Sequence, residues 1–109
     1  MADFKQFLDI DIRAGTIIKV QEFPEARKPA FKLEIDFGYL GNKKSSAQIT
    51  HLYDKKSLIG KQILAVINFP PRQIGPFISE VLTLGVPNKN GHVVLVTPEV
   101  VVENGVRLY

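Results

Sequence analysis

The sequence predicts an all-β domain in which five strands close into a barrel. Three observations favour this fold. Residues Phe31–Phe37 alternate strictly between apolar and charged side chains, which is typical of a strand buried on one face. A glycine interrupts an earlier apolar strand at position 15. The elements run as three strands, a short helix and two further strands.

The N-terminal residues predict a short helix followed by one long, bent strand. Asp3 can cap the helix. Its apolar stripe has i, i+3, i+4 spacing and consists of Phe4, Phe7 and Leu8. A helix this short is unstable alone, so the stripe needs a packing partner. The strand covers Ile12–Phe23, and Gly15 within it is typical of a bulge or a sharp barrel bend.

Two more strands and a second helix follow. The alternating run Phe31–Phe37 is the second strand, and Gly38–Asn42 is a turn. Lys43–Ile49 is a polar third strand. We expect Thr50 to cap a short helix over His51–Leu58, because a threonine hydroxyl can accept a hydrogen bond from the first helical turn.

The second half of the chain contains the remaining barrel strands. Gln62–Phe69 predicts a strand buried on both faces, and Pro70–Pro71 ends it because proline cannot donate to a ladder. Arg72–Phe77 is expected to be an irregular loop. Ile78–Leu84 is the fifth strand, and His92–Thr97 is a further one.

The C-terminal segment predicts an extra β-hairpin. Asn104-Gly105 is a type I′ turn signal that joins Val100–Val102 to Val106–Leu108. Together the elements have the order of the OB-fold, a partly open five-stranded barrel that binds oligonucleotides on one face. An SH3-like barrel and a small sandwich are alternatives, but neither explains the helix position as well. We expect residues 1–109 to form a single domain of this type.

Composition is that of an ordinary globular chain. Hydrophobic residues make up 45% and charged residues 23%, and no cysteine is available for a disulfide or a thiolate site. The N-terminus lacks the pattern of a signal peptide, and no apolar run is long enough to span a bilayer. We therefore expect a cytoplasmic protein without membrane insertion. The net charge of +3 is a mild preference for polyanions.

No group of residues indicates an enzyme. His51 and His92 lie far apart without metal-ligand spacing, so no metal or cofactor is expected. Gly38 and Gly41 stand near lysines but lack the spacing of a phosphate loop. Asp9 and Asp11 can share a strand face, where a solvated pair is far commoner than an acid–base pair. We expect a protein that binds and does not catalyse.

Basic residues surround the strands that border the ligand face of an OB barrel. They are Lys32, Lys43, Lys44, Lys55, Lys56, Lys61 and Arg72. Aromatic residues that could stack on bases are Phe31, Tyr39, Tyr53 and Phe77. A basic rim with stacking platforms suits single-stranded or loop nucleic acid. The alternative is that the lysines only keep the protein soluble and the aromatics belong to the core.

Several ordered sequence blocks resemble one known family. They are Asp11–Ile17, Phe23–Arg27, Leu33–Gly38, Lys44–Thr50, Asn68–Ile74 and Ser79–Leu82. Together they resemble the tRNA-binding domain family, and S-S-A-Q-I-T and N-F-P-P-R are similar to its CsaA subfamily. The resemblance implies an OB-fold homodimer whose terminal segments build the interface. The implied interface residues are Phe4, Phe7, Leu8, Val100, Val101, Val102, Val106 and Leu108.

The resemblance implies two kinds of partner. CsaA-type proteins are described as export-related chaperones that bind unfolded or precursor polypeptides and the Sec translocase motor. Other relatives bind tRNA in trans for aminoacyl-tRNA synthetases. tRNA-binding relatives carry several basic residues after the fourth strand, whereas Pro71–Phe77 here has Arg72 as its single cation. This difference favours polypeptide, with tRNA binding on the same surface, unless Ile74 and Phe77 merely pack the loop.

The expected ligand contacts follow from both hypotheses. They are Lys32, Lys43, Lys44, Ser45, Gln48, Asn68, Arg72, Ile74, Phe77, Ser79 and Glu80. In a peptide complex, Ile74 and Phe77 would receive apolar side chains, and amide or hydroxyl groups would pair with the peptide backbone. In an RNA complex, the cations would contact phosphates and the polar residues an unstacked base. Strand register decides between Ser45 and Ser46.

Overall fold

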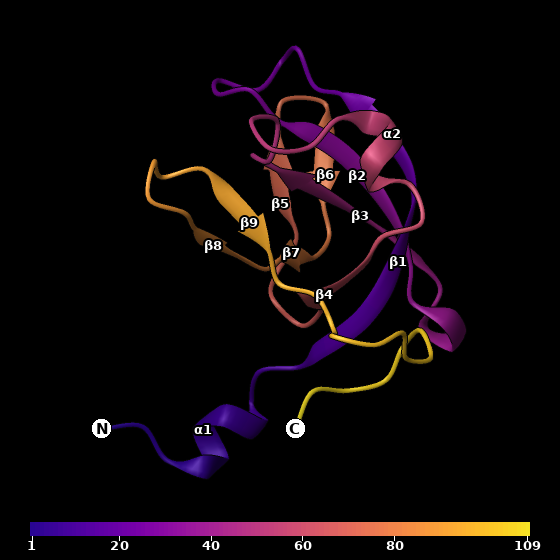
Figure 1. The fold of residues 1–109 in the computed structure, drawn as a ribbon. Helices are drawn as coiled ribbons and strands as arrows, with labels where there is room; N and C mark the ends of the chain where they lie inside the picture. The colour runs from indigo at the N-terminus through magenta and orange to yellow at the C-terminus, as the bar shows by residue number, and fades with distance from the viewer.

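The computed structural model describes all residues, 1–109, as a β-barrel with short helices (Figure 1). The elements are α1 (Phe4–Leu8), β1 (Ile12–Glu22), β2 (Phe31–Asp36), the 3₁₀ helix η1 (Gly38–Leu40), β3 (Asn42–Ala47), α2 (Lys55–Leu58), β4 (Gln62–Val66), β5 (Arg72–Ile74), β6 (Phe77–Ser79), β7 (Leu82–Thr83), β8 (Gly85–Pro87) and β9 (Val93–Leu95).

The main sheet is antiparallel and has the order β3-β2-β1-β4-β7. Its two edges meet just before β7. The amides of Glu80 and Val81 donate to the carbonyl of Lys44 in β3, at 2.8 and 3.3 Å. These bonds nearly close the sheet, which confirms the predicted all-β OB-fold barrel with a helix between its third and fourth strands.

The long strand β1 bends because of one extra residue. Thr16 and Ile17 pair with Asp36 and Ile35 of β2, and the register then shifts before Lys19, which leaves Ile18 as the bulged residue. Gly15, where we expected the bulge or bend, instead allows close packing. A Cβ on Gly15 would lie 2.7 Å from Cγ2 of Ile35 in the core.

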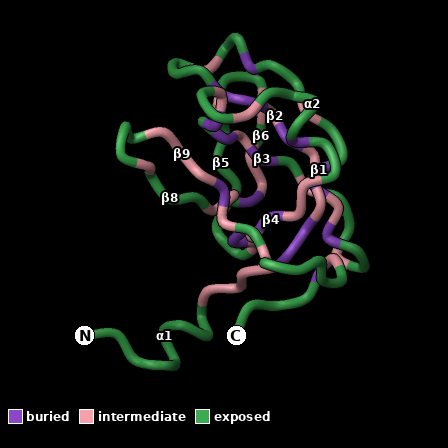
Figure 2. Tube along the Cα trace, in the orientation of Figure 1, coloured by how far each residue is buried: buried purple, intermediate pink, exposed green.

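The core lies inside the barrel, as the alternation in β2 predicts. The largest fully buried side chains are Phe37, Ile17, Leu33, Ile35, Leu58, Ile63 and Ser45. Figure 2 shows buried stretches along β1 to β4, whereas α1 and the outer loops are exposed. Because alternate side chains of each strand are fixed in the core, the side chains between them point outward in regular rows.

Several predicted boundaries were wrong. Thr50 does not cap the second helix, because α2 starts later and Asp54 accepts from the backbone N–H of Ser57 at 2.7 Å. The expected loop Arg72–Phe77 is part of the hairpin β5–β6, which turns at Gly75 with φ +58°. The expected fifth strand is split, because Glu80 and Val81 leave the ladder between β6 and β7 to bond β3.

An extra C-terminal hairpin is present, but β8 and β9 form it, and the predicted pairing of Val100–Val102 with Val106–Leu108 is wrong. The tail beyond β9 pairs with β1 instead of with itself. Ala14 donates to the carbonyl of Val106 at 3.1 Å, and Leu108 donates to the carbonyl of Ile12 at 2.8 Å. The Asn104-Gly105 turn exists, but only Gly105 has positive φ, which excludes type I′.

Candidate ligand-binding face

The outer face of β1, β2 and β3 carries two rows of polar side chains. The register aligns Gln21, Lys32 and Ser46 in one row and Lys19, Glu34 and Lys44 in the next. Neighbouring residues on these strands alternate between the core and this face, so each row extends straight across the sheet. The face is positively charged, because three lysines surround a single glutamate.

A pocket of about 300 Å³ lies on this face beneath Phe77. We call it the lysine pocket, and its lining is Lys19, Gln21, Lys32, Leu33, Glu34, Lys44 and Phe77. The Lys32 ammonium lies 5.3 Å from the Phe23 ring and 5.8 Å from the Phe77 ring, and Lys44 lies 6.0 Å from Phe77. The two rings pack edge to face at 5.3 Å. Cation–π contacts of this kind hold the lysines beside an aromatic surface.

A second, more apolar pocket of about 250 Å³ adjoins the same hairpin. We call it the apolar pocket, and its lining is Ser46, Phe69, Pro70, Arg72, Ile74, Ser79, Glu80, Val81 and Leu82. Phe69 and Leu82 remain 42% and 47% exposed, so apolar surface is available to a ligand. Ser46 faces both the basic row and this pocket, which makes the two sites neighbours.

The structure brings several predicted contacts together and separates others. Lys32, Lys44 and Phe77 share the lysine pocket, whereas Arg72 and Ile74 line the apolar pocket. Lys43 pairs with Ile35 and so lies on the opposite face of β3 from Lys44.

Strand register separates the two serines of β3. Ser45 is fully buried and accepts a hydrogen bond from the Thr83 hydroxyl at 2.9 Å. Ser45 therefore points into the barrel, and Ser46 is the serine that faces outward.

Three further predicted contacts are engaged within the protein. Asn68 accepts from the amide of Asp11 at 2.9 Å and donates to the carbonyl of Asp9 at 2.8 Å. Ser79 accepts from the amide of Ser46 at 3.0 Å, and Glu80 accepts from that of Lys44 at 2.9 Å. These side chains tie distant segments to the barrel, and two of them, Ser79 and Glu80, also line the apolar pocket.

Sequence reasoning missed Lys19, Gln21, Phe23 and Phe69. The bulge at Ile18 reverses the alternation of β1, so Lys19 and Gln21 appear on the wrong face if a regular strand is assumed. Phe69 stands in the N-F-P-P-R block, where the proline pair signals the end of the strand, but no local pattern shows that its ring is exposed.

The cations of the face are free of ion pairs. The salt bridges of the structure are Arg13–Asp11, Lys55–Glu22 and Arg107–Asp11, and none involves Lys19, Lys32, Lys44 or Arg72. Arg13 differs, because its hydrogen bond to Asp11 raises the pKa of its guanidinium. It also donates to Tyr39 and Gly105, so its charge is used to hold the C-terminal turn.

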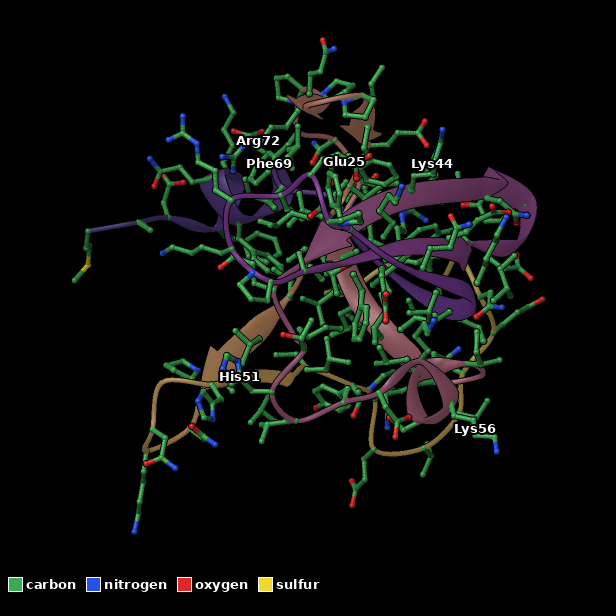
Figure 3. All side chains as sticks on the ribbon, turned by 90° about the horizontal axis from the view of Figure 1, so that it is seen from above. Glu25, Lys44, His51, Lys56, Phe69 and Arg72 are labelled. Atoms are coloured by element: carbon green, nitrogen blue, oxygen red, sulfur yellow. The ribbon has the colours of Figure 1, made fainter.

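Of the predicted stacking platforms, only Phe77 lies on this face. Phe31 is buried, and Tyr39 contacts Arg13 beside the C-terminal turn. Tyr53 accepts from the amide of Leu95 at 3.0 Å. The two histidines stack with ring centroids 4.1 Å apart, on the side of the molecule opposite Lys44 (Figure 3). No group of three or more possible metal ligands occurs.

The barrel, with its basic face beside the packed rings of Phe23 and Phe77, defines an OB-fold binding module. The family described as "Putative tRNA binding domain" matches residues 12–107, and this chain belongs to that family. Within it the chain is of the CsaA type. Crystal structures of chaperone CsaA from Bacillus anthracis strain Ames and of CsaA chaperone protein from Picrophilus torridus are each 52% identical to it, with TM-scores of 0.94. Each comparison covers all of this chain, and 99% and 100% of those chains.

Curated relatives include much longer proteins. Methionine–tRNA ligase of Parabacteroides distasonis is 32% identical over 103 residues, which is 94% of this chain but 15% of that protein. The chain therefore spans about a seventh of the length of these relatives. None of the helices in the structure combines the length and the apolarity needed to cross a membrane.

Proposed function

We propose that this protein is a non-catalytic molecular chaperone that holds unfolded or precursor polypeptides in the cytoplasm during export. The observation that carries the proposal is the apolar pocket, where exposed Phe69 and Leu82 lie beside polar groups at the rim. The two CsaA chaperone structures, which match this chain over its whole length, support it. Docking on the Sec translocase motor belongs to the same proposal.

The pocket suits sequence-tolerant capture of a polypeptide. Burying one aliphatic or aromatic side chain contributes about 1.5–3 kcal/mol, and a small pocket can accept many such side chains. Ser46 and Arg72 are polar residues of the lining, and their side chains can bond a peptide backbone. Affinity from one pocket is modest, so a dimer with two pockets gains from binding one chain twice.

Binding of a short labelled peptide of leucine, serine and asparagine residues would test this proposal. Phe69→Ser is expected to lower its affinity about tenfold, because much of one apolar contact is lost. The matched control is Ile59→Ser, which removes another half-exposed apolar side chain at the end of α2. Equal binding by both variants, or an equal loss, would contradict the proposed pocket.

The working unit in this proposal is a homodimer joined through its termini. No residue of α1 is buried, and the exposed apolar side chains at the two ends are Phe4, Phe7, Leu8, Val100, Val101, Val102, Val106 and Leu108. Both ends lie at one end of the barrel, and Arg107 donates to the carbonyl of Leu8 at 2.7 Å (Figure 1). Sedimentation should give twice 12.2 kDa at micromolar concentration, and a monomer would refute this part.

A second candidate function is tRNA binding, and the unpaired cations of the face favour it. Arg72 is the single cation in its own loop, but Lys19, Lys32 and Lys44 from three strands gather beside that loop. The surface next to this segment therefore carries more positive charge than the Pro71–Phe77 block alone predicts. The lysines can contact phosphates while Phe77 stacks on an unpaired base.

A salt series separates the two functions. RNA affinity should fall about 20-fold between about 50 and 200 mM salt if three phosphates are contacted. Peptide affinity carried by apolar contact should change little. Lys32→Gln/Lys44→Gln is expected to weaken RNA binding and to leave peptide binding intact. Loss of peptide binding in that variant would show that one site serves both ligands.

A further inference from the structure

A third cleft, of about 570 Å³, lies between the loop that joins β1 to β2 and the tip of the hairpin β5–β6. We call it the arginine cleft, and its lining is Glu25, Ala26, Arg27, Lys28, Gln48, Arg72, Gln73, Ile74 and Gly75. Two arginines and one lysine face a single carboxylate, and none of these four charges takes part in a salt bridge. Free cations without an internal partner indicate a site for an external anion.

The walls of the cleft are held in place. Phe23 and Ala30 anchor the two ends of the loop in the core, and Pro24 and Pro29 limit its backbone freedom. The edge-to-face contact of Phe23 with Phe77 joins the loop to the hairpin. Arg27 and Lys28 therefore project from a restrained loop, which lowers the entropy cost of binding.

The same aromatic pair connects the cleft to the lysine pocket. Phe77 lines the lysine pocket, Phe23 begins the loop that lines the cleft, and Lys32 lies over both rings. Figure 3 shows Arg72, Glu25 and Lys44 along one side of the molecule, with Lys56 on the opposite side. Cationic groups thus occur on both sides of the Phe23–Phe77 ring pair. Phosphates flank a stacked base in the same order.

We infer that the arginine cleft is a phosphate subsite that extends the RNA-binding surface beyond the lysine pocket. Guanidinium groups bind phosphate oxygens in a bidentate manner, and Gln48 adds an amide donor at the rim. Ala26 and Ile74 are the apolar residues of the lining, whereas two arginines and a lysine supply its charge, so an RNA backbone fits the cleft better than an apolar polypeptide. This inference rests on the tRNA-binding function proposed above.

The test uses Arg27→Gln/Lys28→Gln with a labelled single-stranded oligouridylate and with bulk tRNA. Both side chains are exposed and form no hydrogen bond or ion pair, so the fold should be unaffected. Losing two phosphate contacts should reduce the slope of log K against log salt by about 1.4, and the affinity at about 0.1 M salt by about 25-fold. The control Lys56→Gln/Lys89→Gln makes the same charge change at exposed positions outside the cleft.

The outcomes distinguish this inference from the proposed function. A reduced slope in the Arg27/Lys28 variant but not in the control supports the subsite. If only Lys32→Gln/Lys44→Gln weakens RNA binding, the subsite is refuted while tRNA binding stands. If the wild-type protein binds neither the oligouridylate nor tRNA, the subsite and the proposed tRNA-binding function are both refuted. If a polyglutamate peptide binds the wild type and loses affinity in the Arg27/Lys28 variant while the RNA slope is unchanged, the cleft is a polypeptide site and the inference is wrong.

Discussion

Asn68→Ala should destabilise the protein without removing a ligand contact. In the structure both polar atoms of the Asn68 side chain are used, one by the amide of Asp11 and the other by the carbonyl of Asp9. These bonds hold the segment before β1 against the end of β4. The sequence suggested a different role, because Asn68 stands in a block that we expected to contact peptide or RNA.

The size of the effect follows from two hydrogen bonds at an exposed position. A hydrogen bond contributes about 0.5–1.5 kcal/mol net, and water replaces part of each lost bond at the surface. We expect a loss of about 1–2 kcal/mol in the free energy of unfolding. For a domain of this size that lowers Tm by about 4–8 °C.

Thermal unfolding followed by circular dichroism measures this shift. Asn90→Ala is a matched control, because Asn90 is an exposed asparagine whose side chain makes no hydrogen bond. Peptide and RNA affinities are then measured well below Tm, where each variant is folded. If Asn68→Ala leaves Tm within about 1 °C of the wild type but loses ligand affinity, the structural role is refuted and the expected ligand contact is restored.

Three further predictions concern the core, the α2 cap and the basic face. Gly15→Ala should cost about 1–3 kcal/mol in urea unfolding, since its Cβ would overlap core side chains; an unchanged midpoint would contradict that packing. The backbone N–H of Ser57 lowers the pKa of Asp54. The stability that this carboxylate adds is therefore present above the usual carboxylate pKa of about 4. It is lost as the pH falls through the lower pKa of Asp54 in the folded protein. Asp54→Ala should therefore be less stable than wild type at neutral pH, and the gap between their Tm values should narrow in acid. Lys44→Gln should weaken RNA binding about fivefold at about 0.1 M salt, whereas Lys43→Gln, on the opposite face, should not.

The structure changes the balance between the two proposed ligands. The sequence favoured polypeptide because Pro71–Phe77 contains one cation. The barrel then places Lys32 and Lys44 next to Phe77, and the loop before β2 adds Arg27 and Lys28 nearby. A charge count within one block therefore underestimates the positive surface. Adjacent basic and apolar pockets therefore give each of the two proposed ligands a candidate site on one face.

The sequence by itself determined the barrel, its element order and its family. Strict alternation in β2 reports burial on one face, and that signal is local because side chains alternate along any strand. Ordered sequence blocks from Asp11 onward indicate the family, which matches residues 12–107. Apolar residues at both termini that need a packing partner were also readable, because hydropathy needs no register.

Only the tertiary structure decided which side chains lie together on the candidate ligand-binding face. The partners of Asn68 and Glu80 lie 57, 59 and 36 residues away in the chain, so no local pattern reveals that these groups are already bonded. One bulged residue, Ile18, sets the face on which Lys19 lies. Register and long-range hydrogen bonds depend on how the strands pair, and pairing is a property of the closed barrel and not of any single segment.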